Sequence, residues 1–189
     1  MAVRRTVLWL ATALVLGAAG AGAATLAGVE LPDRVQVEGH TLQLQGAGLR
    51  KKFFFKVYVG GLYLTTPTSD GAAAIRADEP KRIVMHFLRD VGGEKIRESF
   101  EEGFFKSAQE RLDALRPRID RFLGWFAGEV EQGQQVVLTY LPGAGTRVEV
   151  AGAERGVIEG RDFMEALWGI WLGEAPADHA LKKGMLGTR

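Results

Sequence analysis

Residues 46–64 constrain the fold more than any other part of the chain. The stretch begins with a glycine-rich turn, passes three cations at residues 50–52 and continues as a run of aromatic and β-branched residues. A run that is apolar at odd and at even positions predicts a strand buried on both faces, at the centre of a sheet. Water screens charges poorly beside a core, so the cations at the mouth of this strand are candidates for holding an anion.

Alternation along the stretch places several polar side chains on one face. The even-numbered positions include three cations and a phenol: Arg50, Lys52, Lys56 and Tyr58. If the strand is regular, these side chains project to the same side. A cationic, phenol-bearing face on an apolar wall suits a molecule with an anionic head group and a hydrophobic body. The alternative is that the side chains bury only their stems and reach into water at a strand end.

The rest of the chain alternates between strand and helix patterns. Further strands are predicted at 35–37, 41–44, 81–88, 134–140, 146–150 and 155–158, beside the central strand at about 53–64. Helices are predicted at 70–77 with Asp70 as N-cap, at 90–115, at 162–172 and at 178–186. Pro117 should end or kink the long helix near Arg116, before a second helical stretch. Strands in succession with helices inserted at two places indicate an α+β domain.

The N-terminus predicts an export signal. Arg4 and Arg5 precede an apolar run from Thr6 to about Gly20, and residues 21–23 match a small-x-small cleavage site. We expect residues 1–23 to be a cleaved signal peptide, which makes the protein periplasmic or secreted. An uncleaved anchor is the alternative. The arginine pair is compatible with twin-arginine export, although ordinary secretion signals carry such pairs more often.

Composition excludes several classes of function. The chain has 24 Lys and Arg against 23 Asp and Glu, a formal net charge of +1, which becomes −1 without Arg4 and Arg5. Such a protein lacks the basic footprint of nucleic-acid binding. The absence of cysteine excludes disulfides, a thiol nucleophile, a lipid-modified cysteine and a Cys-ligated zinc. Three scattered histidines, at 40, 86 and 179, show no ligand spacing, so we expect no metal and no cofactor.

Two glycine pairs need a separate interpretation. Gly46-x-Gly48 and Gly143-x-Gly145 lack the third glycine and the strand-to-helix context of a dinucleotide site. We interpret both as turns.

Five motifs, in order, resemble the chalcone isomerase-like superfamily. They are Gly46-Ala-Gly-Leu-Arg50, Phe55-Lys-Val-Tyr-Val-Gly-Gly-Leu-Tyr-Leu64, Lys81-Arg-Ile-Val-Met-His-Phe-Leu88, Tyr140-Leu-Pro-Gly-Ala-Gly-Thr146 and Phe163-Met-Glu-Ala-Leu-Trp-Gly-Ile-Trp-Leu-Gly-Glu174. The similarity covers about residue 28 to the C-terminus, so we assign 28–189 to one domain, and it is greater to the exported bacterial branch than to the plant flavonoid enzymes. It implies an open-faced β-sandwich, in which a large antiparallel sheet carries a layer of helices on one face and a small sheet lies near the other end.

The resemblance also implies site residues. The family arginine after the Gly-x-Gly turn matches Arg50, and the family lysine in the long helix matches Lys95. The family threonine, tyrosine and asparagine fall on Tyr58, Gly92 and Ser99. The plant enzyme cyclises a chalcone, which requires a cation and hydrogen bonds that hold an oxyanion. Here the cation is kept and most of the other polar groups are replaced.

Fatty-acid-binding members of the superfamily resemble this chain in keeping the arginine and a strand tyrosine. By that resemblance Arg50 pairs with a carboxylate, Tyr58 donates a hydrogen bond to it, and an apolar tail lies between sheet and helices. Eight residues of straight strand span roughly 26 Å, so both can reach one head group only if the chain bends near Lys51-Lys52.

Three functions follow as hypotheses. We favour an exported, non-catalytic binder or carrier of a fatty acid or similar amphipathic acid, with no nucleic-acid partner and no stable membrane anchor. Its ligand-binding residues are Arg50, Tyr58, Lys95 and Ser99, and no catalytic residue is assured. The alternative is an intramolecular lyase, an isomerase of chalcone isomerase type, acting on a phenolic or conjugated substrate. The third is an interaction domain whose cleft is filled by Phe53–Phe55 and the tryptophans.

Overall fold

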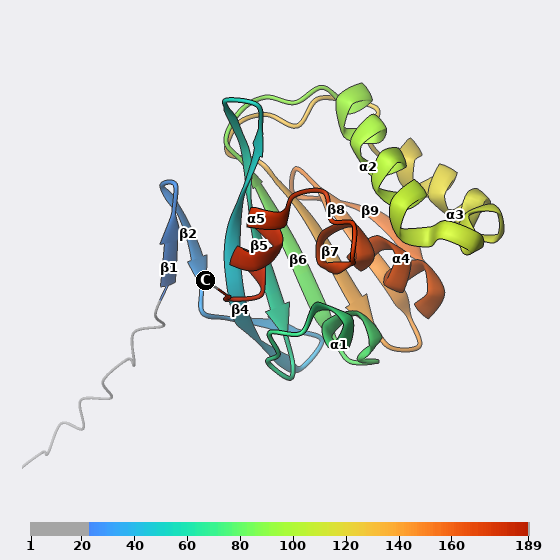
Figure 1. Cartoon of the computed structure of the whole chain (residues 1–189), viewed down its shortest axis with the longest axis horizontal. Coiled ribbons are helices and arrows are strands. Elements are labelled where there is room, and N and C mark those ends of the chain that lie inside the picture. The colour runs from blue at the N-terminus through green and yellow to red at the C-terminus, as the bar shows by residue number, and fades with distance from the viewer. Residues whose placement is uncertain (1–22, 189) are drawn as a thin grey trace, which may run out of the picture.

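Seven strands, in chain order, form one antiparallel sheet. The computed structural model describes residues 23–188 (Figure 1). The strands of the sheet are β3 (Arg34–Val37), β4 (His40–Lys52), β5 (Phe55–Leu64), β6 (Lys81–Phe87), β7 (Gln135–Leu141), β8 (Gly145–Val150) and β9 (Ala153–Ile158). A separate two-stranded sheet, β1 (Ala23–Leu26) and β2 (Val29–Pro32), lies beside it. The predicted large antiparallel sheet is confirmed.

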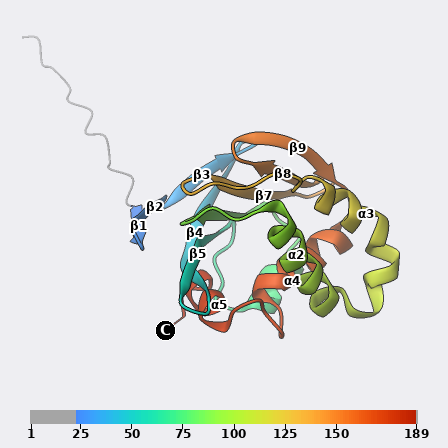
Figure 2. The same ribbon diagram turned by 90° about the horizontal axis from the view of Figure 1, so that it is seen from above.

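Helices cover one face of the curved sheet (Figure 2). They are α1 (Gly71–Arg76), α2 (Gly93–Ala108), the 3₁₀ turn η1 (Gln109–Arg111), α3 (Leu112–Gly124), α4 (Arg161–Leu172) and α5 (His179–Met185). Nine of the twelve residues of α4 are buried, because this helix is covered by the sheet on one side and by α1 and α2 on others. The α+β class and the open-faced sandwich implied by the resemblance are therefore confirmed.

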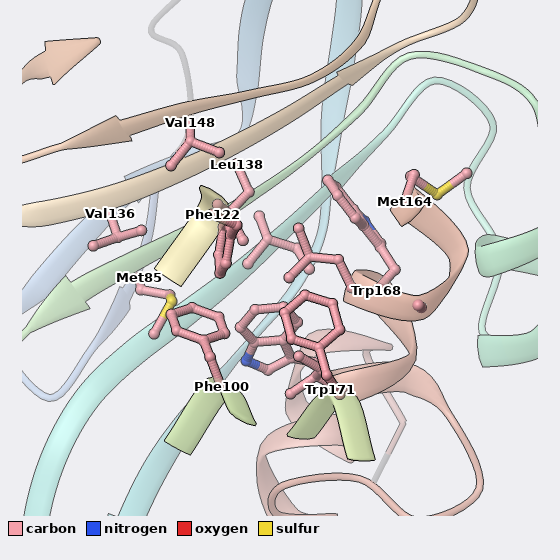
Figure 3. Packing of buried hydrophobic residues seen from close by; sticks show 14 of the residues in the cluster. Met85, Phe100, Phe122, Val136, Leu138, Val148, Met164, Trp168 and Trp171 are labelled. Carbon is pink, nitrogen blue, oxygen red and sulfur yellow. The ribbon is translucent and has the colours of Figure 1, made fainter. Parts of the chain in front are cut away.

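The main core lies between this helical layer and the sheet (Figure 3). Strand side chains such as Met85, Leu138 and Val148 meet aromatic rings from the helices, among them Phe100 and Trp171. Fully burying one such large side chain contributes about 1.5–3 kcal/mol. The aromatic and β-branched composition of the strands and the helical periodicity of the phenylalanines thus produce one continuous core.

A second, smaller cluster lies on the opposite face of the sheet. Val29 and Leu31 of β2 pack there with Val59 and Tyr63 of β5. Because β5 is covered on both faces, residues 58–64 are all buried, as the sequence predicted for a central strand.

The prediction of one long helix at 90–115 is wrong about where the helix ends. α2 ends at Ala108, because Gln109 has a φ of 47°, outside the right-handed helical region. Pro117, which was expected to break the helix, lies inside α3. Its missing N–H costs a helix hydrogen bond, and the packing of α3 on α2, for example Phe122 on Phe100 with ring centroids 4.8 Å apart, offsets that cost.

Two local predictions in the glycine-to-phenylalanine stretch are also wrong. Gly46 and Gly48 are not in a turn but inside β4, with a register shift beside Gly46. The central strand begins at Phe55, and Phe53-Phe54 forms a turn between β4 and β5. An unbroken apolar run therefore contains a chain reversal.

The predicted signal peptide lies outside the described residues, apart from Ala23, with which β1 begins. Over residues 23–188, no helix is both long enough and apolar enough to cross a membrane.

Candidate ligand-binding site

A cavity of about 280 Å³ lies between the sheet and helices α2 and α4. Its walls are mostly apolar and come from β5, β6, α2, α4, the loop between β6 and α2 and the loop after α4: Val57, Met85, Phe87, Val91, Ile96, Phe100, Ile170, Trp171, Ala175 and Ala177. Three of these side chains, Met85, Phe100 and Trp171, are visible in Figure 3, where the cavity wall is also part of the core. The volume is close to the lower end of the range of about 300–1,000 Å³ that is usual for small-molecule sites.

The four predicted ligand-binding residues, Arg50, Tyr58, Lys95 and Ser99, all line this cavity. The structure adds Lys52, Glu102 and Lys106. The two residues from α2 that sequence reasoning missed, Glu102 and Lys106, follow Ser99 at helical spacing, so they share its face of the helix. That periodicity was the signal available in the sequence.

Arg50 and Tyr58 lie directly opposite each other on neighbouring strands. The bend expected near Lys51-Lys52 is a complete hairpin, with a register shift after Arg50 and a two-residue turn at Phe53-Phe54. Opposed residues of an antiparallel pair have Cβ atoms about 4.5–5.5 Å apart. Both side chains can therefore reach the same head group, which a straight strand would not permit.

The Tyr58 hydroxyl has a hydrogen to donate and no acceptor for it in the described part of the chain. The indole Nε1–H of Trp171 donates to Tyr58 Oη at 2.9 Å. The tyrosine oxygen is therefore an acceptor in this bond, and the hydroxyl hydrogen of Tyr58 remains free to donate. No acceptor for that hydrogen is found among residues 23–188. Burial raises the pKa of Tyr58 to about 12, although the Trp171 hydrogen bond and the charge of Arg50 act in the opposite direction. The phenol is therefore neutral and ready to donate at neutral pH.

Arg50 is already paired with a carboxylate of the protein. Its Nη1 donates to Asp178 Oδ2 at 3.2 Å and to the Lys51 carbonyl at 2.8 Å. Asp178 is the N-cap of α5, where its Oδ1 accepts from the backbone N–H of Ala180 and Leu181. The Nε and Nη2 donors of Arg50 have no hydrogen-bond partner within the described part of the chain. These two groups are available to donate hydrogen bonds to a second anion.

Asp178 is ionised at neutral pH. Burial acts to raise the pKa of its carboxyl, but hydrogen bonds from the backbone of Leu181 and Lys51 and from the Arg50 guanidinium outweigh it and hold the pKa below its usual value. Sequence reasoning identified residues 178–186 as a helix without linking them to Arg50. The ion pair joins residues 128 positions apart.

Lys95 and Ser99 lie at the rim of the cavity and bond within their own helix. Lys95 Nζ pairs with Glu98 at 2.9 Å with 68% of its side chain exposed. Ser99 Oγ donates to the Lys95 carbonyl at 2.8 Å. Gly92, at the position of the family tyrosine, is the N-cap of α2 and has no side chain to contribute. The polar groups of α2 therefore do not converge on Arg50.

Four cations line the rim, and three of them pair with carboxylates. The cations are Arg50, Lys52, Lys95 and Lys106. Arg50 pairs with Asp178, Lys95 with Glu98 and Lys106 with Glu102. The hydrogen bond from Lys106 lowers the pKa of Glu102, and the charges of Lys52 and Arg50 add to this effect, so Glu102 is ionised and partly neutralises Lys106. Of the four, Lys52 alone has no ion pair among residues 23–188, so the rim keeps a small excess of positive charge, which raises the local concentration of anions. In residues 23–188 no cluster of three His, Cys, Asp or Glu side chains is suited to hold a metal ion.

Comparisons with known proteins match this architecture. A family model described as chalcone isomerase-like matches residues 23–187. The crystal structure of a fatty-acid binding protein of Arabidopsis thaliana is similar, with a TM-score of 0.70 and 18% sequence identity over 87% of this chain and 96% of that chain. At this identity the similarity shows a common fold. A comparison with curated protein sequences finds no match.

Proposed function

Because the chain belongs to the chalcone isomerase-like family, we propose that it is a non-catalytic binder or carrier of a fatty acid or a similar amphipathic acid. The observation that carries this proposal is an apolar cavity with Arg50 and Tyr58 side by side in its wall. The carboxylate of the ligand lies against these two side chains, and its hydrocarbon chain lies between β5, β6, α2 and α4.

The end of the cavity at Arg50 and Tyr58 favours a ligand group that accepts hydrogen bonds. Arg50 offers Nε and Nη2, which can only donate, and Tyr58 offers a hydroxyl whose oxygen already accepts from Trp171. Two converging donors, one of them charged, suit a carboxylate, since charge-assisted and bidentate hydrogen bonds are the strong ones. A neutral ligand such as an ester would use this end poorly.

The rest of the cavity selects hydrocarbon. Most of its lining is aliphatic or aromatic, and each buried CH₂ group contributes about 0.8 kcal/mol. Affinity should therefore rise with chain length until the cavity of about 280 Å³ is full.

Binding is favoured over the alternative of an intramolecular lyase. Stabilising the charge that develops in a cyclisation takes several preorganised donors around the reacting oxygen. Lys95 and Ser99 are instead engaged along α2, and Gly92 has no side chain. The third hypothesis, an interaction domain with a filled cleft, is not favoured either. Phe53–Phe55 are exposed to solvent, and none of the three lines the cavity.

Calorimetric titration of saturated fatty acids of increasing length into the wild type, Arg50→Ala and Tyr58→Phe tests the proposal. Arg50→Ala should lose a charge-assisted pair worth about 1.5–3 kcal/mol, a roughly tenfold to more than hundredfold loss of affinity. Tyr58→Phe should lose about 0.5–1.5 kcal/mol. Equal affinity of Arg50→Ala and the wild type would remove the anchor from the proposal.

Two controls separate binding from folding. The methyl ester of the same acid should bind wild type and Arg50→Ala equally, because it lacks the charge. Thermal unfolding should be recorded for each variant, since Arg50→Ala also releases Asp178 and Tyr58→Phe leaves the buried Trp171 Nε1–H without its acceptor. If Arg50→Ala no longer unfolds cooperatively, Arg50 is a structural residue and the proposal loses its anchor.

A further inference from the structure

The tip of the β4–β5 hairpin, residues 51–56, exposes three consecutive phenylalanines. Phe53, Phe54 and Phe55 are 85%, 98% and 57% exposed. The hairpin extends beyond the body of the sheet at the top of Figure 1. Single exposed apolar residues are common on protein surfaces, but three adjacent rings form a contiguous patch, which marks a contact surface.

The turn is built from an unfavourable residue. Phe53 has a φ of 55° and is the first of the two loop residues between Lys52 and Phe55. A positive φ at this position is typical of a type II′ turn, in which glycine is preferred. A bulky side chain is strained there, and because Phe53 is 85% exposed, packing against the described residues offers little to offset the strain.

Charge adds a further unfavourable term. Lys51 and Lys56 lie directly opposite each other on the two strands, and like charges in that position destabilise a hairpin. Lys52 lies next to them, no acidic residue occurs between residues 50 and 56, and the Arg89 guanidinium stacks on the Phe55 ring at 4.6 Å. The tip is therefore an aromatic wedge surrounded by cations.

We propose that the hairpin tip docks on the surface of an anionic lipid bilayer. The phenylalanine rings enter the boundary between head groups and acyl chains, while the lysines and Arg89 contact lipid phosphates, the combination used by peripheral membrane-binding segments. At such a surface the rings leave water and the opposed lysines acquire counter-charges. The exposure of the rings and the repulsion between the lysines, both unfavourable in the isolated protein, are thus offset at the bilayer.

Charge distinguishes a bilayer from a second copy of the chain. Two hairpin tips that stacked their rings would bring Lys51, Lys52 and Lys56 of both copies together, and their repulsion would oppose the contact. A negatively charged leaflet is complementary to the same residues.

Docking would bring the cavity close to the lipid. Arg50 and Tyr58 lie on the same hairpin, a few residues from the tip, so an amphipathic acid could pass between bilayer and cavity. This consequence rests on the proposed function, whereas docking itself does not, because the test below uses vesicles without added fatty acid.

A local reporter tests the proposal in the full chain. The chain has no cysteine, so Phe54→Cys provides a single site for an environment-sensitive fluorophore. Vesicles of phosphatidylcholine with phosphatidylglycerol should shift the emission to the blue and increase it several-fold, and pure phosphatidylcholine vesicles should do so much less. The same label at Phe105, a 68% exposed residue of α2, is the matched control and should not respond.

Because the label reports its own position, any other segment that touches the vesicle does not affect the conclusion. In the labelled chain, Lys51→Gln with Lys56→Gln should weaken the response to anionic vesicles about 30-fold, as expected for two cations near the surface. Arg34→Gln with Lys183→Gln removes the same charge from exposed positions elsewhere and should have little effect.

Three results would overturn the proposal. The first is an unchanged spectrum at position 54 with anionic vesicles. The second is an equal loss in the two charge variants, which would indicate only non-specific attraction. The third is a blue shift that grows with protein concentration in the absence of vesicles, which would identify the tip as a contact between copies of the chain.

Discussion

Arg50 contacts an internal carboxylate and, in the proposed function, an external one as well. Its pair with Asp178 is partly buried, with 24% and 15% of the two side chains exposed. The pair holds the N-terminus of α5 against β4, and it also neutralises part of the charge available to a ligand. The affinity of the site for a carboxylate is therefore set by the difference between the two interactions.

At the residue scale we predict that Asp178→Asn strengthens the binding of a fatty-acid carboxylate. Asparagine retains the N-cap hydrogen bonds to Ala180 and Leu181, but it no longer neutralises Arg50. The gain should be about 0.5–1.5 kcal/mol, roughly two- to tenfold in affinity, measured by the same calorimetric titration.

The double variant Arg50→Ala, Asp178→Asn is the control for this prediction. If Asp178 acts only by competing for Arg50, its replacement gives no gain once Arg50 is absent, and the double-mutant cycle shows a coupling energy. Equal gains in both backgrounds would mean that Asp178 repels the ligand directly.

At the scale of secondary-structure elements, a glycine contact between β4 and α5 positions this ion pair. A Cβ atom at Gly46 would overlap the Gly184 carbonyl, and one at Gly48 would overlap the backbone of Leu181. The helix thus lies directly on the strand backbone, close enough for its N-cap Asp178 to reach Arg50. The Gly-x-Gly motif, interpreted from sequence as a turn, is instead the surface on which α5 packs.

Gly48→Ala should therefore lower the free energy of unfolding by about 1–3 kcal/mol or more, because the rigid backbone of α5 has to move. Gly124→Ala, at the end of α3, is the control: nothing lies within 4 Å of the added methyl group, and alanine favours a helix by up to about 1 kcal/mol. Denaturant unfolding measures both. Similar stabilities for the two variants would contradict the close contact of β4 and α5.

At the scale of the whole molecule, the three tyrosines report on three different regions. Tyr58 lies at the cavity, Tyr63 lies in the small cluster beneath β2, and Tyr140 donates to Asp78 at 2.7 Å. Burial is the main cause that raises the pKa of each phenol to about 12. Because unfolding exposes all three, their ionisation is linked to the stability of the entire fold.

We predict that the folded protein shows little tyrosinate absorbance near pH 11, whereas the chain unfolded in guanidinium shows roughly nine-tenths of its full signal there. The sign of the linkage follows. The unfolded phenols ionise near pH 10 and the folded ones near 12, so the unfolded state holds fewer protons in between and stability falls as pH rises through this window.

Tyr58→Phe provides the control for this titration, because it should remove one third of the late-titrating absorbance and leave the rest unchanged. A folded protein that titrates near pH 10 would contradict the burial of these phenols.

The sequence by itself determined the elements whose signals are local. Alternation and helical periodicity predicted the strands and helices, and Asp70 was identified as the cap of α1, where it accepts from Ala72 and Ala73. The ordered motifs identified the family, and through it the four residues that line one cavity.

Tertiary structure alone decided the features that depend on distant partners. The Phe53-Phe54 reversal was missed because apolar composition predicts burial, whereas a turn depends on backbone dihedral angles. The end of α2 at Gln109 and the tolerance of Pro117 depend on how α3 packs against α2. The pairing of Arg50 with Asp178 needs α5 to lie on two glycines of β4. Periodicity reports which face of an element is apolar, while the partner of each charge is set by contacts between segments far apart in the chain.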